Sequence, residues 1–146
     1  MGDRIINIYC INDFHGAVES LLWWDKKDRS ITDNKGIKLF SYLKNKRVKN
    51  NNTLILSAGD MFQVQNHNKN NFEGLTPLLM KEVKFDGITI GNHEFDWKAE
   101  EEDYFYKLSK QIQSSVICSN LYYKPTEKRT KGLLGSKIIN FFGLKI

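Results

Sequence analysis

The chain has few cysteines and no long apolar run. Only 2 cysteines occur in 146 residues, too few for the disulfide framework that stabilises small secreted domains. Both of them, Cys10 and Cys118, stand in apolar, strand-like segments, so we expect buried free thiols. No segment approaches the roughly 18 apolar residues of a membrane span, and no signal-peptide segment precedes the first strand-like run. As written, the sequence therefore predicts a cytoplasmic protein without a membrane partner.

An excess of acidic residues is also missing. The chain has 22 Lys and Arg against 17 Asp and Glu, which gives a net charge of +5. Basic proteins can meet nucleic acids or anionic lipids. The lysines here are scattered, however, and many stand beside asparagine, a pattern typical of a solvated surface. We therefore expect no nucleic-acid partner, and 146 residues allow at most one modest domain.

Apolar runs alternate with amphipathic segments along the chain. The run Ile5–Ile11 is almost continuously apolar, which favours a strand buried on both faces. The strands predicted in this way are Ile5–Ile11, Thr53–Ser57, Gly87–Ile90 and Ser115–Ser119, and the predicted helices are Ile37–Val48, Leu75–Val83 and Trp97–Ile112. This order predicts an α/β fold with a mostly parallel sheet.

The segments between and after these elements are less regular. We expect a short helix or packed loop at Leu21–Trp24 and an Asn- and Lys-rich loop at Gln63–Asn71. Leu121–Ser136 is basic and predicted to be irregular. Ile138–Ile146 is predicted to form a hairpin around Asn140–Gly143.

Polar side chains follow three of the predicted strands directly. Asp13 and His15 come after the first strand, Asp60 after the second, and Asn92 and His93 after the third. In parallel sheets, ligands bind at the carboxyl ends of the strands. Carboxylate, amide and imidazole groups suit hard or borderline divalent metals. The pattern therefore predicts a metal site at this edge of the sheet.

Each motif also has a purely structural interpretation. Asp13 and His15 fit a turn with a surface histidine, although in an extended segment their spacing places both side chains on one side. Asp60 could cap a helix or form a turn. Asn92 could be an N-cap, with Glu94 and Asp96 favourably placed in the first helical turn.

Taken together, the motifs resemble the N-terminal part of the calcineurin-like metallophosphoesterase domain. The similarity is greatest to the branch of 5′-nucleotidases and 2′,3′-cyclic phosphodiesterases. The matching segments are Ile11–Gly16, Leu56–Gln63 and Phe85–Asp96, with a weaker match at Val116–Leu121. The resemblance covers nearly the whole chain. It implies that residues 1–146 form the N-terminal half of a four-layer α-β-β-α sandwich.

The resemblance also implies a ligand set for two divalent ions, which could be Zn, Mn, Fe or Co. Asp13 and His15 would ligate the first ion, Asp60 would bridge both, and Asn92 would ligate the second. A metal-bound hydroxide would attack phosphorus in line. The implied activity is hydrolysis of a small-molecule phosphoester, and a nucleotide is the expected substrate class.

A catalytic pair is implied as well. His93, paired with Asp96, would stabilise the transition state or protonate the leaving group. The third histidine, His67, stands in the Asn- and Lys-rich loop, and we do not expect it to be a ligand.

The family's domain uses further histidine ligands that this chain does not provide. We therefore expect a truncated domain, without its downstream part and its C-terminal substrate domain, that has little activity alone. The alternative to an enzyme is an inactive remnant or a split subunit whose site is completed by a C-terminal segment. Family members are often exported, so the resemblance leaves the compartment open.

Overall fold

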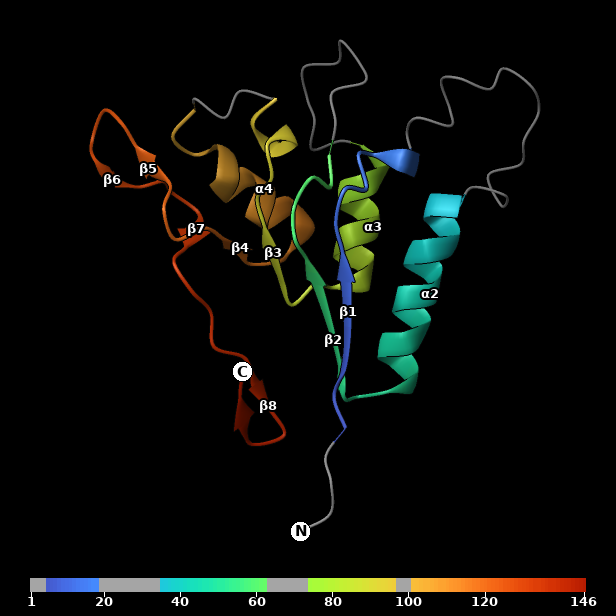
Figure 1. The fold of residues 1–146 in the computed structure, drawn as a ribbon. Helices are drawn as coiled ribbons and strands as arrows, with labels where there is room; N and C mark the ends of the chain where they lie inside the picture. The colour runs from blue at the N-terminus through green and yellow to red at the C-terminus, as the bar shows by residue number, and fades with distance from the viewer. Residues whose placement is uncertain (1–4, 19–34, 63–73, 97–100) are drawn as a thin grey trace, which may run out of the picture.

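The structure is a computed structural model that describes residues 5–18, 35–62, 74–96 and 101–146. Its main sheet has five strands in the order β1-β2-β3-β4-β7, all paired in parallel (Figure 1). The strands are β1 (Asn7–Ile11), β2 (Thr53–Ser57), β3 (Gly87–Thr89), β4 (Val116–Ile117) and β7 (Leu133–Leu134). The predicted α/β fold is confirmed, and all four predicted strands lie in this sheet.

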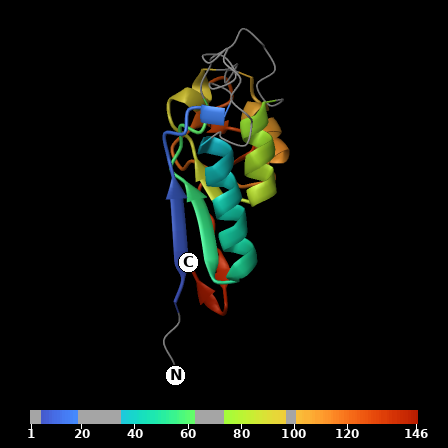
Figure 2. The ribbon, with the colours of Figure 1, turned by 90° about the vertical axis from the view of Figure 1, so that its right-hand side faces the viewer.

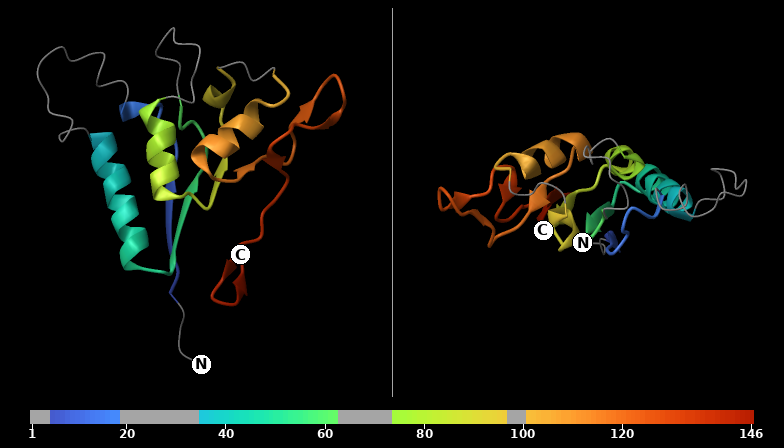
Figure 3. Two further views of the ribbon diagram at one scale, coloured as in Figure 1. Left: turned by 180° about the vertical axis from the view of Figure 1, so that it is seen from behind. Right: turned by 90° about the horizontal axis from the view of Figure 1, so that it is seen from above.

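Three helices cover one face of the sheet (Figures 2 and 3). They are α2 (Lys35–Lys49), α3 (Leu75–Val83) and α4 (Tyr104–Ile112). The core lies between the two layers, where Phe40 and Phe105 are almost fully buried against strand residues such as Ile55. One helix layer on one sheet layer corresponds to half of the expected four-layer sandwich. Among the described residues, no helix is long and apolar enough to cross a bilayer.

Strand β1 is not buried on both faces, contrary to the sequence prediction. It is one of the two edge strands of the sheet, and its residues alternate between half-buried and exposed. Ile8 is 59% exposed and Cys10 is also exposed. The expectation of two buried thiols is therefore wrong for Cys10, and Cys118 is only half-buried. The reason is that the described helices cover the other face, so every second side chain of β1 points away from them.

Helix α4 begins later than predicted. The described residues 101–103 form turns, and the helix starts at Tyr104. Glu101 and Asp103 stand just before the helix and contact Lys107 at 3.2 Å and 3.0 Å. The predictions for Leu21–Trp24 and Gln63–Asn71 fall outside the described residues.

The segment predicted as irregular contains short strands. Tyr122–Tyr123 (β5) and Lys128–Arg129 (β6) form an antiparallel hairpin, and β7 then joins the main sheet beside β4. Strands of two residues are too short to produce a periodic pattern. The hairpin predicted near the C-terminus is confirmed as β8 (Asn140–Phe141) and β9 (Leu144–Lys145).

Candidate metal centre

The loops that follow β1 and β2 lie side by side and share backbone hydrogen bonds. The amide of Asp13 donates to the carbonyl of Gly59 at 3.2 Å, and the amide of His15 donates to the carbonyl of Asp60 at 3.0 Å. These bonds extend the pairing of the two strands beyond the sheet. They bring the polar side chains of both loops to the carboxyl edge of the sheet.

The loop after β3 joins them through Asp60. The backbone amide of His93 donates to Asp60 Oδ1 at 2.9 Å. Gly91 lies against the same carboxylate, since a Cβ atom there would be only 2.2 Å from Asp60 Oδ1. Gly59 in turn allows the two loops to approach, because its own Cβ would be 2.6 Å from the amide nitrogen of Gly91.

Asp13, His15 and Asp60 form a candidate cation site. Each offers one ligand atom, and these atoms all lie within 4.8 Å of one another. His15 Nε2 and Asp13 Oδ1 are 3.6 Å apart, too far for a hydrogen bond. Two donors at about 2.1 Å from one tetrahedral ion are separated by about 3.4 Å. The donor types and spacing therefore fit a divalent metal.

The way in which Asp13 and His15 meet differs from the prediction. An extended segment was expected, but their φ angles are 52° and 51°, and that of Asp60 is 52°. All three thus have the left-handed backbone conformation that non-glycine residues seldom adopt. The side chains converge because the chain turns sharply at each strand end, with Gly16 (φ 58°) continuing the first turn.

His93 and Asp96 form a pair beside this cluster. They lie at the two ends of the short 3₁₀ helix η3 (His93–Phe95), with His93 Nδ1 and Asp96 Oδ2 2.7 Å apart. The Asp96 hydrogen bond raises the pKa of His93, and the negative charges of Asp60 and Glu94 add to this effect. The rings of His93 and His15 meet edge to face, with centroids 4.7 Å apart.

Asn92 is the one predicted ligand that is not part of the cluster of Asp13, His15 and Asp60. It precedes η3 in the N-cap position, but its side chain makes no capping hydrogen bond and the residue is exposed. Its backbone lies between Gly91 and His93, both of which contact Asp60. Its role as a ligand stays a prediction, and His67 lies outside the described residues.

The fold and this strand-end cluster agree with the comparisons with known proteins. Residues 6–144 match the family model of the calcineurin-like phosphoesterases. The chain belongs to the calcineurin-like phosphoesterase family.

Two further proteins are similar to this family member. Endonuclease YhcR of Bacillus subtilis (strain 168) is 32% identical over 95 residues, which are 62% of this chain and 8% of that protein. The structure of the NAD nucleotidase NadN of Haemophilus influenzae matches 96% of this chain and 25% of its own, with a TM-score of 0.67 and 22% identity. The structural likeness shows a shared fold. The chain thus spans a quarter or less of the length of both proteins.

Sequence reasoning assigned no site role to Glu94. In the structure its side chain is fully buried and accepts hydrogen bonds from the backbone of the loops after β2 and β3. The sequence contained one signal, a charged residue between two candidate site residues. A buried glutamate cannot be distinguished from an exposed one by such a pattern.

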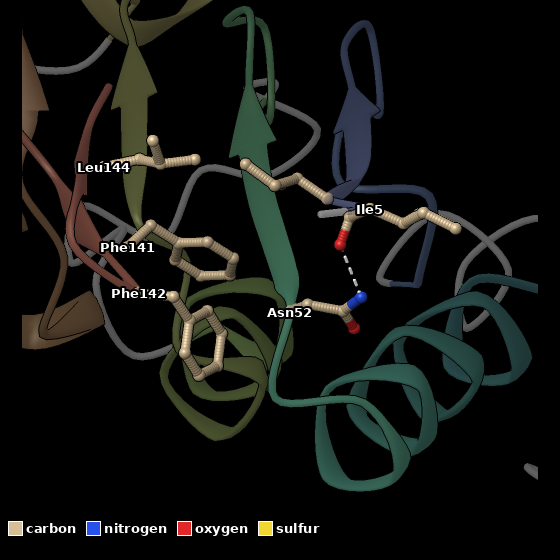
Figure 4. Close-up of a pocket in the computed structure, with 6 residues that line it drawn as sticks. Ile5, Asn52, Phe141, Phe142 and Leu144 are labelled. Carbon is tan, nitrogen blue, oxygen red and sulfur yellow. Dashed lines mark hydrogen bonds between the residues drawn. The ribbon is translucent and has the colours of Figure 1, made fainter. Parts of the chain in front are cut away.

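An apolar cavity lies at the other end of the sheet, where β1 and β2 begin (Figure 4). Its volume is about 400 Å³, and it is lined by Ile5, Ile6, Asn52, Phe141, Phe142 and Leu144. The side-chain amide of Asn52 donates to the carbonyl of Ile5 at 2.6 Å. The cavity lies between the residues that precede β1 and β2 and the hairpin of β8 and β9. It is therefore separate from the candidate metal centre of this phosphoesterase family member.

Proposed function

We propose that the chain provides part of a divalent-metal centre for phosphoester hydrolysis. The observation that carries the proposal is the convergence of Asp13, His15 and Asp60 within 4.8 Å at adjacent strand ends. Membership of the calcineurin-like phosphoesterase family supports the reaction class.

The proposed centre would hold two ions, and Asp60 would be a ligand of both. Asp13 and His15 would hold one ion, and Asn92 would contribute to the other. The chemistry supplied by divalent metals at such a site is polarisation of a phosphoryl oxygen and a lowered pKa of coordinated water. Zn, Mn, Fe and Co are all compatible with this set of oxygen and nitrogen donors.

His93 is the proposed proton donor or charge stabiliser. Its Nδ1 atom is 2.7 Å from Asp96, which orients the ring and leaves Nε2 for the substrate. The raised pKa of His93 keeps the imidazolium form available at a higher pH. A protonated imidazole can donate to the leaving oxygen as the phosphoester bond breaks.

Nucleotides are the proposed substrate class. The motifs resemble the 5′-nucleotidase branch, and the structurally similar protein is named an NAD nucleotidase. The related endonuclease also acts, by its name, on a phosphodiester of nucleotides. A nucleoside monophosphate and a simple diester are therefore the first compounds to test.

The decisive experiment is a Co²⁺ titration of the purified chain, followed by the visible absorption of the bound ion. We expect a saturable spectrum in the wild type that is lost in Asp60→Ala and Asp13→Ala. Glu82→Gln, on the exposed surface of α3, serves as the control and should bind like the wild type. A wild-type chain without a saturable Co²⁺ spectrum would contradict the proposal.

A hydrolysis assay distinguishes an active enzyme from an inactive remnant or a split subunit. Release of phosphate from adenosine 5′-monophosphate, or of nitrophenol from a bis-nitrophenyl phosphate, would support a self-sufficient enzyme. Metal binding without turnover would favour the remnant or split-subunit alternative, since the three clustered ligands include a single histidine. In that case a complementing C-terminal segment is the proposed partner.

A further inference from the structure

We infer that Glu94 is a positioning residue that fixes the Asp60 loop and the His93 loop in the arrangement needed for metal binding. The inference rests on the proposed function. It assigns the metal centre a residue that contacts neither the metal nor the substrate.

The first observation is how Glu94 is bonded. Its Oε2 atom accepts from the backbone amides of Asp60 at 2.9 Å and Gly91 at 2.6 Å. Its Oε1 atom accepts from the amide of Met61 at 2.8 Å, with that of Phe62 at 3.4 Å. One buried side chain therefore serves four backbone donors from two loops.

The second observation is the shape of the loop after β2. Gly59 has a φ of 103° and Asp60 has a φ of 52°, so the amides of three successive residues turn toward one point. Such a concave set of amides binds an anion. Here the anion is the protein's own carboxylate, and Met61 and Phe62 are nearly fully buried, so water cannot replace it easily.

The third observation links this contact to the candidate ligands. Glu94 lies in η3 next to His93, whose amide donates to Asp60 Oδ1 at 2.9 Å. Glu94 thus holds the backbone of Asp60, while the adjacent residue holds its side chain. Groups that orient metal ligands in this way typically contribute about 10–100-fold to metal affinity.

Glu94→Gln tests the inference with little change in volume. The amide keeps one acceptor oxygen but turns an NH₂ group toward backbone donors. Either the amides of Met61 and Phe62 or those of Asp60 and Gly91 therefore lose their acceptor. In the metal-free chain we expect faster hydrogen exchange at the amides of Asp60, Met61 or Gly91, and at that of His93. In the titrated chain we expect the Kd for Co²⁺ to rise by roughly 10–100-fold.

Two matched variants separate positioning from loss of charge or of stability. Glu82→Gln removes the same charge from the exposed surface of α3, where the carboxylate contacts Lys44. Ile112→Val removes a buried methyl group from the last turn of α4. Both should keep the wild-type Kd for Co²⁺ and the wild-type exchange at the loop amides.

Each outcome decides the inference. Faster exchange with an unchanged Kd, or no change in either, would overturn it. If Glu94→Gln does not fold, Glu94→Asp is measured instead, because its shorter side chain cannot reach both loops. If neither variant folds, the role of Glu94 is merely structural and the inference is wrong. A wild-type chain that binds no Co²⁺ refutes the proposed function instead. In that case hydrogen exchange at the His93 amide still tests the inference, because unchanged exchange in Glu94→Gln would show that Glu94 does not position this loop.

Discussion

Three of the candidate ligands have strained backbones. Asp13, His15 and Asp60 have φ angles of 51–52°, a region that costs a non-glycine residue on the order of 1–3 kcal/mol. Backbone hydrogen bonds between neighbouring loops, such as that from the His15 amide to the Asp60 carbonyl, hold them there. The strain is concentrated where the carboxylates and the imidazole meet, as is typical of sites under functional constraint.

Gly91 allows the Asp60 carboxylate to occupy its position. In Gly91→Ala the new Cβ would be 2.2 Å from Asp60 Oδ1 and 2.8 Å from its backbone nitrogen, so the carboxylate must move. We expect at least a ten-fold weaker Kd for Co²⁺, since displaced or poorly oriented ligands lose on the order of 10–100-fold in affinity.

A glycine of β3 offers the matched control for this variant. In Gly87→Ala the new Cβ would meet the ends of two side chains, Ile117 at 3.0 Å and Leu56 at 4.0 Å, and the nearer one can shift. We expect the Kd for Co²⁺ of Gly87→Ala to equal that of the wild type. An equal loss of affinity in both variants would show that the effect is not specific to Asp60.

The His93–Asp96 pair predicts a pH dependence. Because the Asp96 hydrogen bond raises the pKa of His93 above 6.5, the pair stabilises the folded state fully below the unfolded-state pKa. This stabilisation is lost as the pH rises through the folded-state pKa. Asp96→Asn should lower the pKa of His93 and weaken this dependence. An NMR titration of the metal-free chain measures the pKa, and an unchanged value in Asp96→Asn would contradict the assignment.

The residues that follow helices α3 and α4 have an unfavourable backbone conformation, so substitution there can stabilise the fold. Helices α3 and α4 are followed by Lys84 and Gln113 in the left-handed conformation, with φ angles of 61° and 51°. Glycine adopts this conformation without the penalty that a side chain brings, and it is the usual residue at helix C-termini.

Gln113→Gly should therefore raise the free energy of unfolding by roughly 1 kcal/mol. Gln111→Gly provides the contrast, because Gln111 lies inside α4 and glycine there should lower the same quantity by about 1 kcal/mol. Urea unfolding of the two variants measures both effects. A loss of stability in Gln113→Gly would show that its side chain contributes more than the strain costs.

At the scale of the whole molecule, the described helices lie on one face of the sheet (Figure 3). Ile55 on β2 is fully buried, whereas Ile8 on the neighbouring β1 is 59% exposed. We expect Ile55→Ala to lower the free energy of unfolding by about 2–5 kcal/mol and Ile8→Ala by about 0.5 kcal/mol or less. Urea unfolding tests this contrast, and equal losses would mean that both faces of the sheet are covered in solution.

The sequence by itself determined most of the longer elements and the location of the candidate centre. Strand β2 and helix α3 have the predicted bounds, because a continuous apolar run and a helical period are local patterns. The approach of Asp13, His15 and Asp60 followed from the rule that parallel strands present their carboxyl ends at one edge. Their side-chain chemistry was likewise local information.

The tertiary structure decided what depends on distant neighbours. Glu94 is buried because its acceptor atoms meet amides such as that of Asp60, 34 residues away, and no local pattern contains that contact. The exposed face of β1 and the addition of β7 to the sheet depend equally on which elements pack where. Side-chain identity and the periodicity of apolar residues can be read from the sequence. Burial and hydrogen-bond partners, in contrast, depend on which distant segments pack together.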